Sequence, residues 1–292
     1  MKTIYPFILL FIGCFLSLEI NAQTLDTLTK LPAIVNESSG IELSADGQVW
    51  NLTDSGGEAA LYLCDTTGQL LRTLKITNAW NRDWEDMTAD SAGNFFIGNM
   101  GNNANDNKDL SIFKIANPDA CEADSIEAEV ITFAFEDQEA FPPKKSKMNF
   151  DCEAIIWSAG HLYLFTKHRS LPMATNLYRI PDRKGHHIAR KIGSFQMEAP
   201  QEGEHPIFDY WITAADISPD GKKVVLLSGN KLWMFYDYEE DRFLDGQHKV
   251  IRLGATTQKE AICFINNEEL FITDEFLVQF KVGQNLYRLK LQ

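Results

Sequence analysis

A short sequence pattern recurs five times along the chain, and it constrains the fold more than any other feature. Each copy has three positions: the first two are acidic or small residues, and the third is Ile or Met. An apolar, strand-like run follows the third position. Repeats of this kind are typical of folds that arrange one supersecondary unit several times. The five copies are Ser39–Ile41, Glu85–Met87, Glu153–Ile155, Ala215–Ile217 and Glu260–Ile262.

Each copy is followed by a tight turn and by further strand-like runs. Asp-Gly and Asn-rich turns supply the left-handed backbone conformations that hairpins need. Short apolar and aromatic runs between such turns predict strands rather than helices. The predicted turns are Ala45–Gln48, Asp90–Asn94, Ser158–Gly160, Ser218–Gly221 and Asn266–Glu268. The predicted outermost strands of the first four units are Leu70–Ile76, Glu129–Phe135, Ala189–Phe195 and Lys249–Leu253.

The fifth unit has three predicted strands, one fewer than the others. The alternating segment Thr24–Leu31 can supply the missing strand, and pairing the two ends in one sheet leaves no open edge. The sequence therefore predicts an all-β, five-bladed β-propeller whose N-terminal strand closes the last blade. A six-bladed propeller and a β-sandwich are the alternatives. The predicted blades cover residues 36–77, 83–136, 150–196, 211–254 and 259–292 with 24–31.

Residues 1–22 have the pattern of a cleaved signal peptide. Lys2 precedes an apolar run, Tyr5–Leu18, and the small residue Ala22 stands at the expected cleavage site. The run is short for a spanning helix, which needs about 20 residues. A retained anchor helix and lipoprotein processing at Cys14 are the alternatives. We expect a single propeller domain over residues 23–292, exported to the periplasm, the cell surface or the extracellular space, with no transmembrane segment after signal removal.

Four cysteines follow the predicted signal peptide. An even number in an exported chain permits disulfides. However, Cys64, Cys152 and Cys263 lie in apolar strand-like runs, where a buried free thiol is the simpler interpretation. We expect mostly free thiols.

The net charge excludes one large class of partner. Asp and Glu number 41 against 27 Lys and Arg, which gives a formal net charge of -14. Nucleic-acid binding requires a basic face, and an anionic membrane surface repels such a chain. The same charge favours bound cations. We expect a monomer that binds a small molecule, a glycan or a protein, and no nucleic acid.

The candidate site follows from the geometry of a four-stranded blade. The innermost strand lines the central channel, and its starting end meets the loop between the second and third strands on one face. Carboxylates outnumber basic residues there, so this face should carry a negative potential. The ligand-binding residues that we predict on it are Asp54, Asp83, Trp84, Glu85, Asn99, Glu153, Lys167, Arg169, Asp216 and Glu260.

Two chemistries fit such a ring of carboxylates and amides. Ca²⁺ takes 6–8 oxygen ligands, and its candidate ligands here are Glu85, Glu153, Glu260, Asp54 and Asn99. The simpler interpretation is that these side chains bond only to water and to backbone amides, because no contiguous calcium loop is present. Paired carboxylates can also hydrolyse a glycosidic bond by acid/base catalysis. The basic pair Lys167 and Arg169 could bind a ligand's phosphate or carboxylate, or balance the neighbouring acids.

No nucleophile or cofactor motif accompanies these residues. The sequence contains no G-x-S-x-G, H-E-x-x-H, phosphate-binding loop or dinucleotide fingerprint. We therefore assign no catalytic residue. The leading hypothesis is a non-enzymatic binding or scaffold module with an acidic channel face. The alternative is a Ca²⁺-dependent hydrolase of phosphate-ester or glycoside substrates.

Four segments carry a family resemblance: Asn51–Gly57, Asn81–Asp86, Ile97–Asn103 and Thr213–Gly221. They resemble a broad group of exported bacterial propellers, similar to the esterase-like phytase and SdiA-regulated propeller groupings, over nearly the whole chain after the signal peptide. The β-propeller phytases bind several calcium ions and cleave phosphate esters. Asp151–Ala154 resembles their acidic signature, but Glu37–Ile41 stands where their opening Asp-rich motif would be. The resemblance therefore implies the propeller fold rather than phytase activity.

Overall fold

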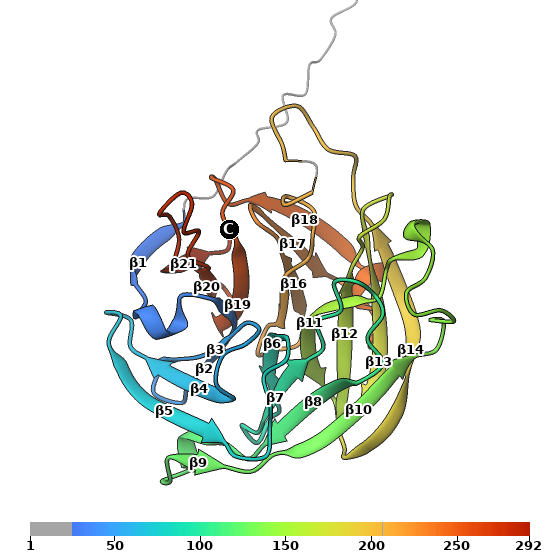
Figure 1. Ribbon diagram of the computed structural model, residues 1–292. Coiled ribbons are helices and arrows are strands. Elements are labelled where there is room, and N and C mark those ends of the chain that lie inside the picture. The colour runs from blue at the N-terminus through green and yellow to red at the C-terminus, as the bar shows by residue number, and fades with distance from the viewer. Residues whose placement is uncertain (1–24, 206) are drawn as a thin grey trace, which may run out of the picture.

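A computed structural model describes residues 25–205 and 207–292 (Figure 1). The predicted signal peptide lies outside these residues. The regular structure of the described chain is β-strand, apart from four 3-10 helices at Ala33–Val35, Pro118–Ala120, Lys145–Lys147 and Phe243–Asp245. No helix in the described residues is long and apolar enough to cross a membrane.

The described strands form four sheets of four, eight, four and five strands, and their antiparallel pairings divide them into five four-stranded units. The first contains β2 (Ser38–Leu43), β3 (Val49–Thr53), β4 (Ala60–Cys64) and β5 (Leu70–Ile76). The second contains β6 (Trp84–Ala89), β7 (Phe95–Asn99), β8 (Leu110–Ile115) and β10 (Glu129–Phe135), and the third β11 (Asp151–Ser158), β12 (His161–Lys167), β13 (Ala174–Pro181) and β14 (Gly185–Gln196). The fourth contains β15 (Ala214–Ile217), β16 (Lys223–Leu227), β17 (Lys231–Tyr236) and β18 (Gln247–Arg252). The fifth contains β19 (Lys259–Asn266), β20 (Glu269–Asp274), β21 (Asn285–Lys290) and β1 (Asp26–Lys30).

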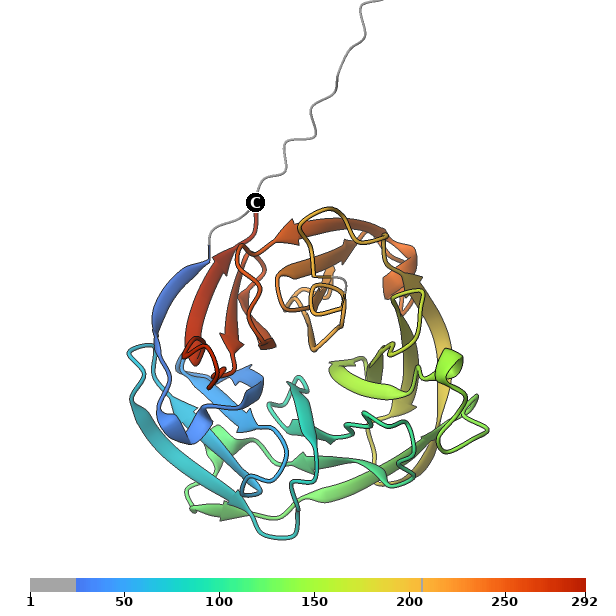
Figure 2. The ribbon, with the colours of Figure 1, turned by 45° about the horizontal axis from the view of Figure 1, so that its top comes forward.

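The innermost strands of the five units close a ring around the centre. Strand β2 contacts β6, β6 contacts β11, β11 contacts β15, β15 contacts β19, and β19 contacts β2. Figure 2 looks into the ring and shows the sheets arranged radially around it. The predicted all-β propeller is therefore confirmed.

The first and last described strands pair in the fifth unit, as the sequence predicted. Strand β1 pairs antiparallel with β21, with Asp26 opposite Arg288 and Lys30 opposite Asn285. The Leu31 backbone N–H continues the contact by donating to the Gln284 carbonyl oxygen at 2.8 Å. The N-terminal strand thus covers the outer edge of the last sheet.

Strand β14 is longer than the sequence predicted, and its extra length joins two units. It begins at Gly185 rather than Ala189. The segment from Gly185 to Ala189 pairs in parallel with β10, with Ile131 opposite Gly185 and Phe135 opposite Ala189. The short strand β9 (Ser125–Ile126) likewise adds to the edge of β5 in parallel. These exposed outer segments lack an alternating apolar pattern, which is why periodicity did not reveal them.

Apolar side chains fill the spaces between neighbouring sheets. Between the first and second units, Trp50, Trp84 and Phe113 are fully buried in one cluster. All four cysteines in the described residues are free, with Cys121 partly exposed and the other three buried. The expectation of mostly free thiols is confirmed. This packing holds the starting ends of the innermost strands at fixed positions around the channel.

Candidate functional site

A β-bulge near the start of four innermost strands positions the site. The pairing register shifts between Ser38 and Gly40 in β2, and in the same way in β6, β11 and β19. A bulge places one extra residue in the strand and redirects its side chain. The residues at these shifts include Ser39, Glu85, Glu153 and Glu260. Three glutamates from three different units therefore reach the same end of the channel.

These bulged residues line a small hollow at the channel mouth with a volume of about 160 Å³. The hollow also receives side chains that follow the second strands, including Asp54 after β3 and Glu275 after β20. It brings together most of the acidic residues that the sequence predicted. Its lining residues are Ser39, Asp54, Glu85, Asn103, Glu153, Lys167, Gln258, Glu260 and Glu275.

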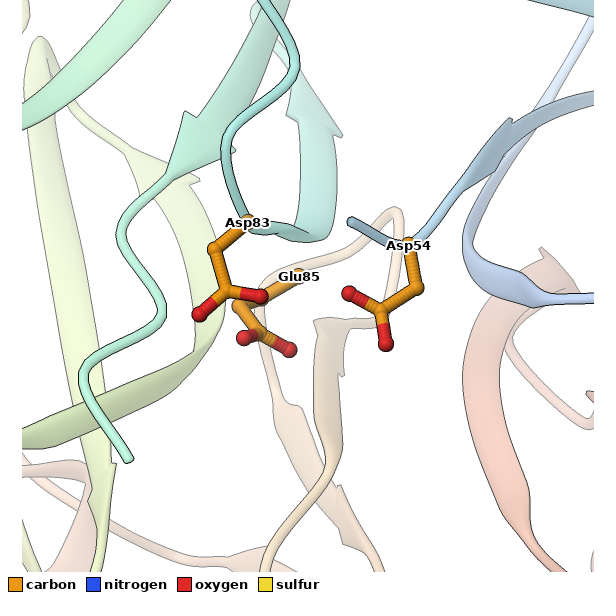
Figure 3. Close-up of side chains that lie close together, drawn as sticks. All are labelled: Asp54, Asp83 and Glu85. Carbon is orange, nitrogen blue, oxygen red and sulfur yellow. The ribbon is translucent and has the colours of Figure 1, made fainter. Parts of the chain in front are cut away.

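Three carboxylates converge at one side of this hollow (Figure 3). One carboxylate oxygen from each of Asp54, Asp83 and Glu85 lies within 4.8 Å of the other two. Gly101 makes room for this convergence, because a Cβ atom there would lie 2.1 Å from Glu85 Oε1 and 2.2 Å from Asp83 Oδ2. We call Asp54, Asp83 and Glu85 the carboxylate triad.

The basic pair predicted on this face is present, and each member is bound to a carboxylate. Lys167 Nζ lies 2.7 Å from Glu153 Oε2. Arg169 pairs with Asp151, and its guanidinium lies 3.7 Å from Glu153 Oε1. Both cations are therefore committed to Asp151 and Glu153, and they leave the carboxylate triad without a direct cationic partner among the described residues.

Burial and mutual repulsion raise the pKa values of the acidic groups at the mouth. Desolvation, with the Asp54 and Asp151 charges, raises the pKa of Asp83 to about 6. Burial, opposed by Lys167, raises the pKa of Glu260 to about 7, and burial beside Glu260 and Asp54 raises that of Glu275 to about 9. Burial and the Glu153 charge raise the pKa of Glu85 well above its usual range. A bound cation would relieve this repulsion.

A larger cavity of about 700 Å³ adjoins the hollow and shares Asn103, Lys167, Gln258 and Glu260 with it. Its lining includes the apolar and aromatic residues Phe208, Trp211, Leu277, Phe280 and Val282. Phe280 is 74% exposed and Phe208 is 48% exposed, so the cavity is open to solvent between them. Its volume lies in the range of small-molecule sites, about 300–1,000 Å³.

Two of the predicted ligand-binding residues face elsewhere. The Trp84 side chain is fully buried in the core between the first two units, and its Nε1–H donates to the Trp80 carbonyl oxygen at 3.1 Å. The Asn99 side chain is also fully buried, where its Oδ1 accepts from the Arg82 and Asp83 backbone N–H groups and its Nδ2 donates to Ser111 Oγ. Both predictions were wrong: Trp84 is a packing residue, and Asn99 has no oxygen free for a metal.

Asp216 also lies away from the mouth. The sequence prediction had aligned the fourth unit with the other four in the wrong register. In the fourth unit, Asp216 stands two residues before Ser218, whose carbonyl oxygen accepts from the Gly221 N–H in a turn. In the first unit, Glu42 stands two residues before Ser44, which begins the equivalent turn. Asp216 Oδ2 accepts from the Phe264 N–H at 2.6 Å, so this carboxylate ties the fourth unit to the fifth. Burial raises its pKa to about 7. The turn spacing, Glu-x-Ser and Asp-x-Ser, would have given the correct alignment.

Sequence analysis did not assign several residues that complete the site. Gln258 was missed: its Nε2 donates to Oε2 of Glu275, a residue that the loop after the second strand places on this face, at 2.9 Å, and both line the hollow. The aromatic lining residues of the larger cavity come from loops that periodicity does not describe. One signal was available: Phe276–Val282 is an apolar segment in a loop, where polar residues are the rule.

Comparison with known proteins supports the fold and nothing more specific. No family model and no curated protein matches the sequence. A PQQ-bound aldose sugar dehydrogenase from Streptomyces coelicolor is similar in structure, with a TM-score of 0.51 and 9% identity over 91% of this chain and 97% of that chain. A putative gluconolactonase has a TM-score of 0.45 and 11% identity over 87% of this chain and 73% of that one. At such identity a likeness shows the fold alone, and the phytase-like resemblance stays a prediction.

Proposed function

We propose that this protein is an exported binding module that holds a small ligand at the acidic channel mouth through a divalent cation, with Ca²⁺ as the metal. The surplus of carboxylates carries the proposal. Five carboxylate side chains line the hollow, and Lys167 is the single amine among its lining residues. The negative charge that remains is best balanced by a small, doubly charged cation.

The carboxylate triad has the dimensions of a calcium site. Two oxygens bound to one Ca²⁺ at about 2.4 Å can lie no more than about 4.8 Å apart. The triad oxygens of Asp54, Asp83 and Glu85 meet this limit. Ca²⁺ takes 6–8 oxygens, so positions remain for backbone carbonyls, water and the ligand. Glu153 is a weaker candidate than the sequence indicated, because Lys167 already occupies one of its oxygens.

The neighbouring cavity defines the class of ligand. Its lining contains the polar residues Lys167, Gln258 and Glu260, which it shares with the hollow, and the exposed apolar residues Phe208 and Phe280. A ligand with an oxygen-rich end and an apolar body fits this division. The oxygens would reach the cation and the polar residues, and the body would pack against the aromatic rings.

Removal of Ca²⁺ is expected to destabilise the protein increasingly as the pH rises. Because the folded-state pKa values of Asp83, Glu260 and Glu275 are raised, the stability these groups contribute is present below about pH 4 and is lost as the pH passes about 6, 7 and 9. The unfolding temperature of the calcium-free protein should fall between pH 5 and pH 9. Added Ca²⁺ should restore it, with an affinity that rises about tenfold per pH unit for each proton displaced.

Thermal unfolding and isothermal titration calorimetry in buffers of different ionisation enthalpy measure both effects. Asp54→Asn should lose the calcium response. Asp46→Asn makes the same change in an exposed turn and should keep it. If Ca²⁺ leaves the wild-type unfolding temperature unchanged at pH 8, or shifts Asp54→Asn equally, the calcium proposal is wrong.

Hydrolysis is the second candidate, and the unequal pKa values at the mouth favour it over other activities. Glu275, with a pKa of about 9, would remain protonated at neutral pH, while Glu260, with a pKa of about 7, could exchange a proton. Such a pair can divide acid and base roles. Aryl phosphate and aryl glycoside assays with Ca²⁺ separate the two functions. The binding proposal expects that the wild-type protein shows no more turnover than Glu260→Gln. If the wild type turns over a substrate and Glu260→Gln, while still folded, does not, the protein is a hydrolase.

A further inference from the structure

A second cavity lies on the flank of the second unit and shares no lining residue with the channel site. Its volume is about 540 Å³. Polar and charged side chains line it together with one tryptophan. The residues of this flank cavity are Trp80, Arg82, Lys108, Asp109, Ser111, Thr132 and His186.

A polar row across three strands forms the floor of the flank cavity. Ser111 in β8 lies opposite Thr132 in β10, and Thr132 lies opposite His186 in β14. Thr132 Oγ1 and His186 Nδ1 are 3.1 Å apart. The next row, Phe113 opposite Val130, belongs to the apolar core, so polarity is confined to the row that faces the cavity. The parallel extension of β14 brings His186 into this row.

Trp80 gives the flank cavity an exposed aromatic surface. Its ring meets the buried Phe113 ring edge-on, with centroids 5.1 Å apart, yet 52% of the residue is exposed. The contact with Phe113 holds the ring, and the bond from Trp84 Nε1 holds the Trp80 backbone. A fixed, open indole face suits the apolar C–H face of a sugar ring.

Two cations without a carboxylate partner complete the flank cavity. Arg82 and Lys108 form no ion pair within the described part of the chain, although the protein carries a net charge of -14. Arg82 is held by Asn107 Oδ1 at 3.2 Å and by the Asp109 carbonyl oxygen at 3.0 Å. Arg82 Nη2 also donates to the Asn99 carbonyl oxygen at 3.3 Å, and all three acceptors are neutral, so no carboxylate of the described residues is hydrogen-bonded to the guanidinium.

We propose that the flank cavity binds an acidic sugar, a uronic acid unit of a glycan. The pyranose ring packs on Trp80, and the carboxylate pairs with Arg82 and Lys108. The ring hydroxyls bond to Asp109 and His186, which can accept and donate hydrogen bonds. The cavity has room for about one or two sugar rings, and a uronic acid can use its aromatic surface, hydroxyl partners and cation pair together.

Titration of the full chain with a galacturonic acid trisaccharide tests this site. Trp80→Ala and Lys108→Ala change exposed side chains, so both variants should fold, and each should weaken binding at least about tenfold. Lys144→Ala, another exposed lysine, should bind like the wild type. The neutral galactose trisaccharide should bind at least about tenfold more weakly than the acidic one, and salt should reduce that difference.

Other results would overturn the proposal. They are equal affinity for the acidic and neutral sugars, no effect of Trp80→Ala or Lys108→Ala, or displacement of the sugar by inorganic phosphate at equal concentration. Asp54→Asn should leave this binding unchanged, because Asp54 lines the channel hollow and not the flank cavity. The two sites can therefore be tested separately.

Discussion

Replacing Gly101 with alanine is expected to weaken calcium binding at the channel mouth about 100-fold without removing any charged group. The new Cβ would lie 2.1 Å from Glu85 Oε1 and 2.2 Å from Asp83 Oδ2. Contacts below 3.0 Å essentially never occur for a Cβ atom, so both carboxylates must move. Two of the three triad ligands would then leave the positions that allow them to share one cation.

Calorimetric titration of Gly101→Ala should show an affinity for Ca²⁺ about 100-fold weaker, as expected when metal ligands lose their orientation. Backbone strain does not contribute, because Gly101 is not among the glycines with positive φ. Gly193→Ala is the matched control, since its Cβ would meet nothing closer than 3.8 Å and its φ is also ordinary. Unchanged calcium affinity in Gly101→Ala would show that the triad is not the metal site.

The blades were predictable because their signals are local. Turns such as Ser44–Gly47, Asp90–Gly93 and Ser218–Gly221 join the first two strands of their units, where the sequence placed them. The role of β1 was also predictable, because the fifth unit lacked a strand and the segment near the N-terminus alternated. Local turn chemistry and strand period therefore determined most of the architecture.

The features that the sequence did not reveal depend on pairing between distant segments. A bulge at Glu153 or Glu260 adds one residue without changing the residue types, so no composition signal marks it. The error at Asp216 has the same origin, because Ala215–Ile217 matched the repeat by residue type in the wrong register. Phe208, which precedes β15, and Phe280, between β20 and β21, line the same cavity although they are far apart in the sequence.

A buried carboxylate at the centre of the channel joins three units, and it belongs to the fold rather than to the site. Asp86 is fully buried. Its Oδ1 accepts from its neighbour Met87 at 2.9 Å, and its Oδ2 accepts from Ile155 in β11 at 3.0 Å and from Ala215 in β15 at 3.2 Å. Burial raises the pKa of Asp86, while these three N–H donors lower it.

Asp86→Ala is therefore expected to be among the most destabilising single substitutions in the chain. It would leave three buried N–H groups in three units without an acceptor, at about 1–3 kcal/mol each. Asp86→Asn keeps the shape of the side chain and one acceptor oxygen, which can still accept from the Ile155 and Ala215 N–H groups. Its loss of stability should therefore be close to the cost of leaving one N–H group, that of Met87, without an acceptor. Since native domains are stable by about 5–15 kcal/mol, the alanine variant should unfold at much lower denaturant.

Urea unfolding midpoints should therefore fall in the order wild type, Asp86→Asn, Asp86→Ala. Asp46→Asn provides the surface control for the asparagine change and should unfold like the wild type. An alanine midpoint close to that of the wild type would mean that water replaces the carboxylate at the channel centre. Asp86 directly follows Glu85 in the bulge, so such a result would also show that closure of the ring does not depend on the Asp86 side chain beside this bulge. The expected order would instead show that the Asp86 side chain stabilises the ring at the point where the neighbouring Glu85 enters the site.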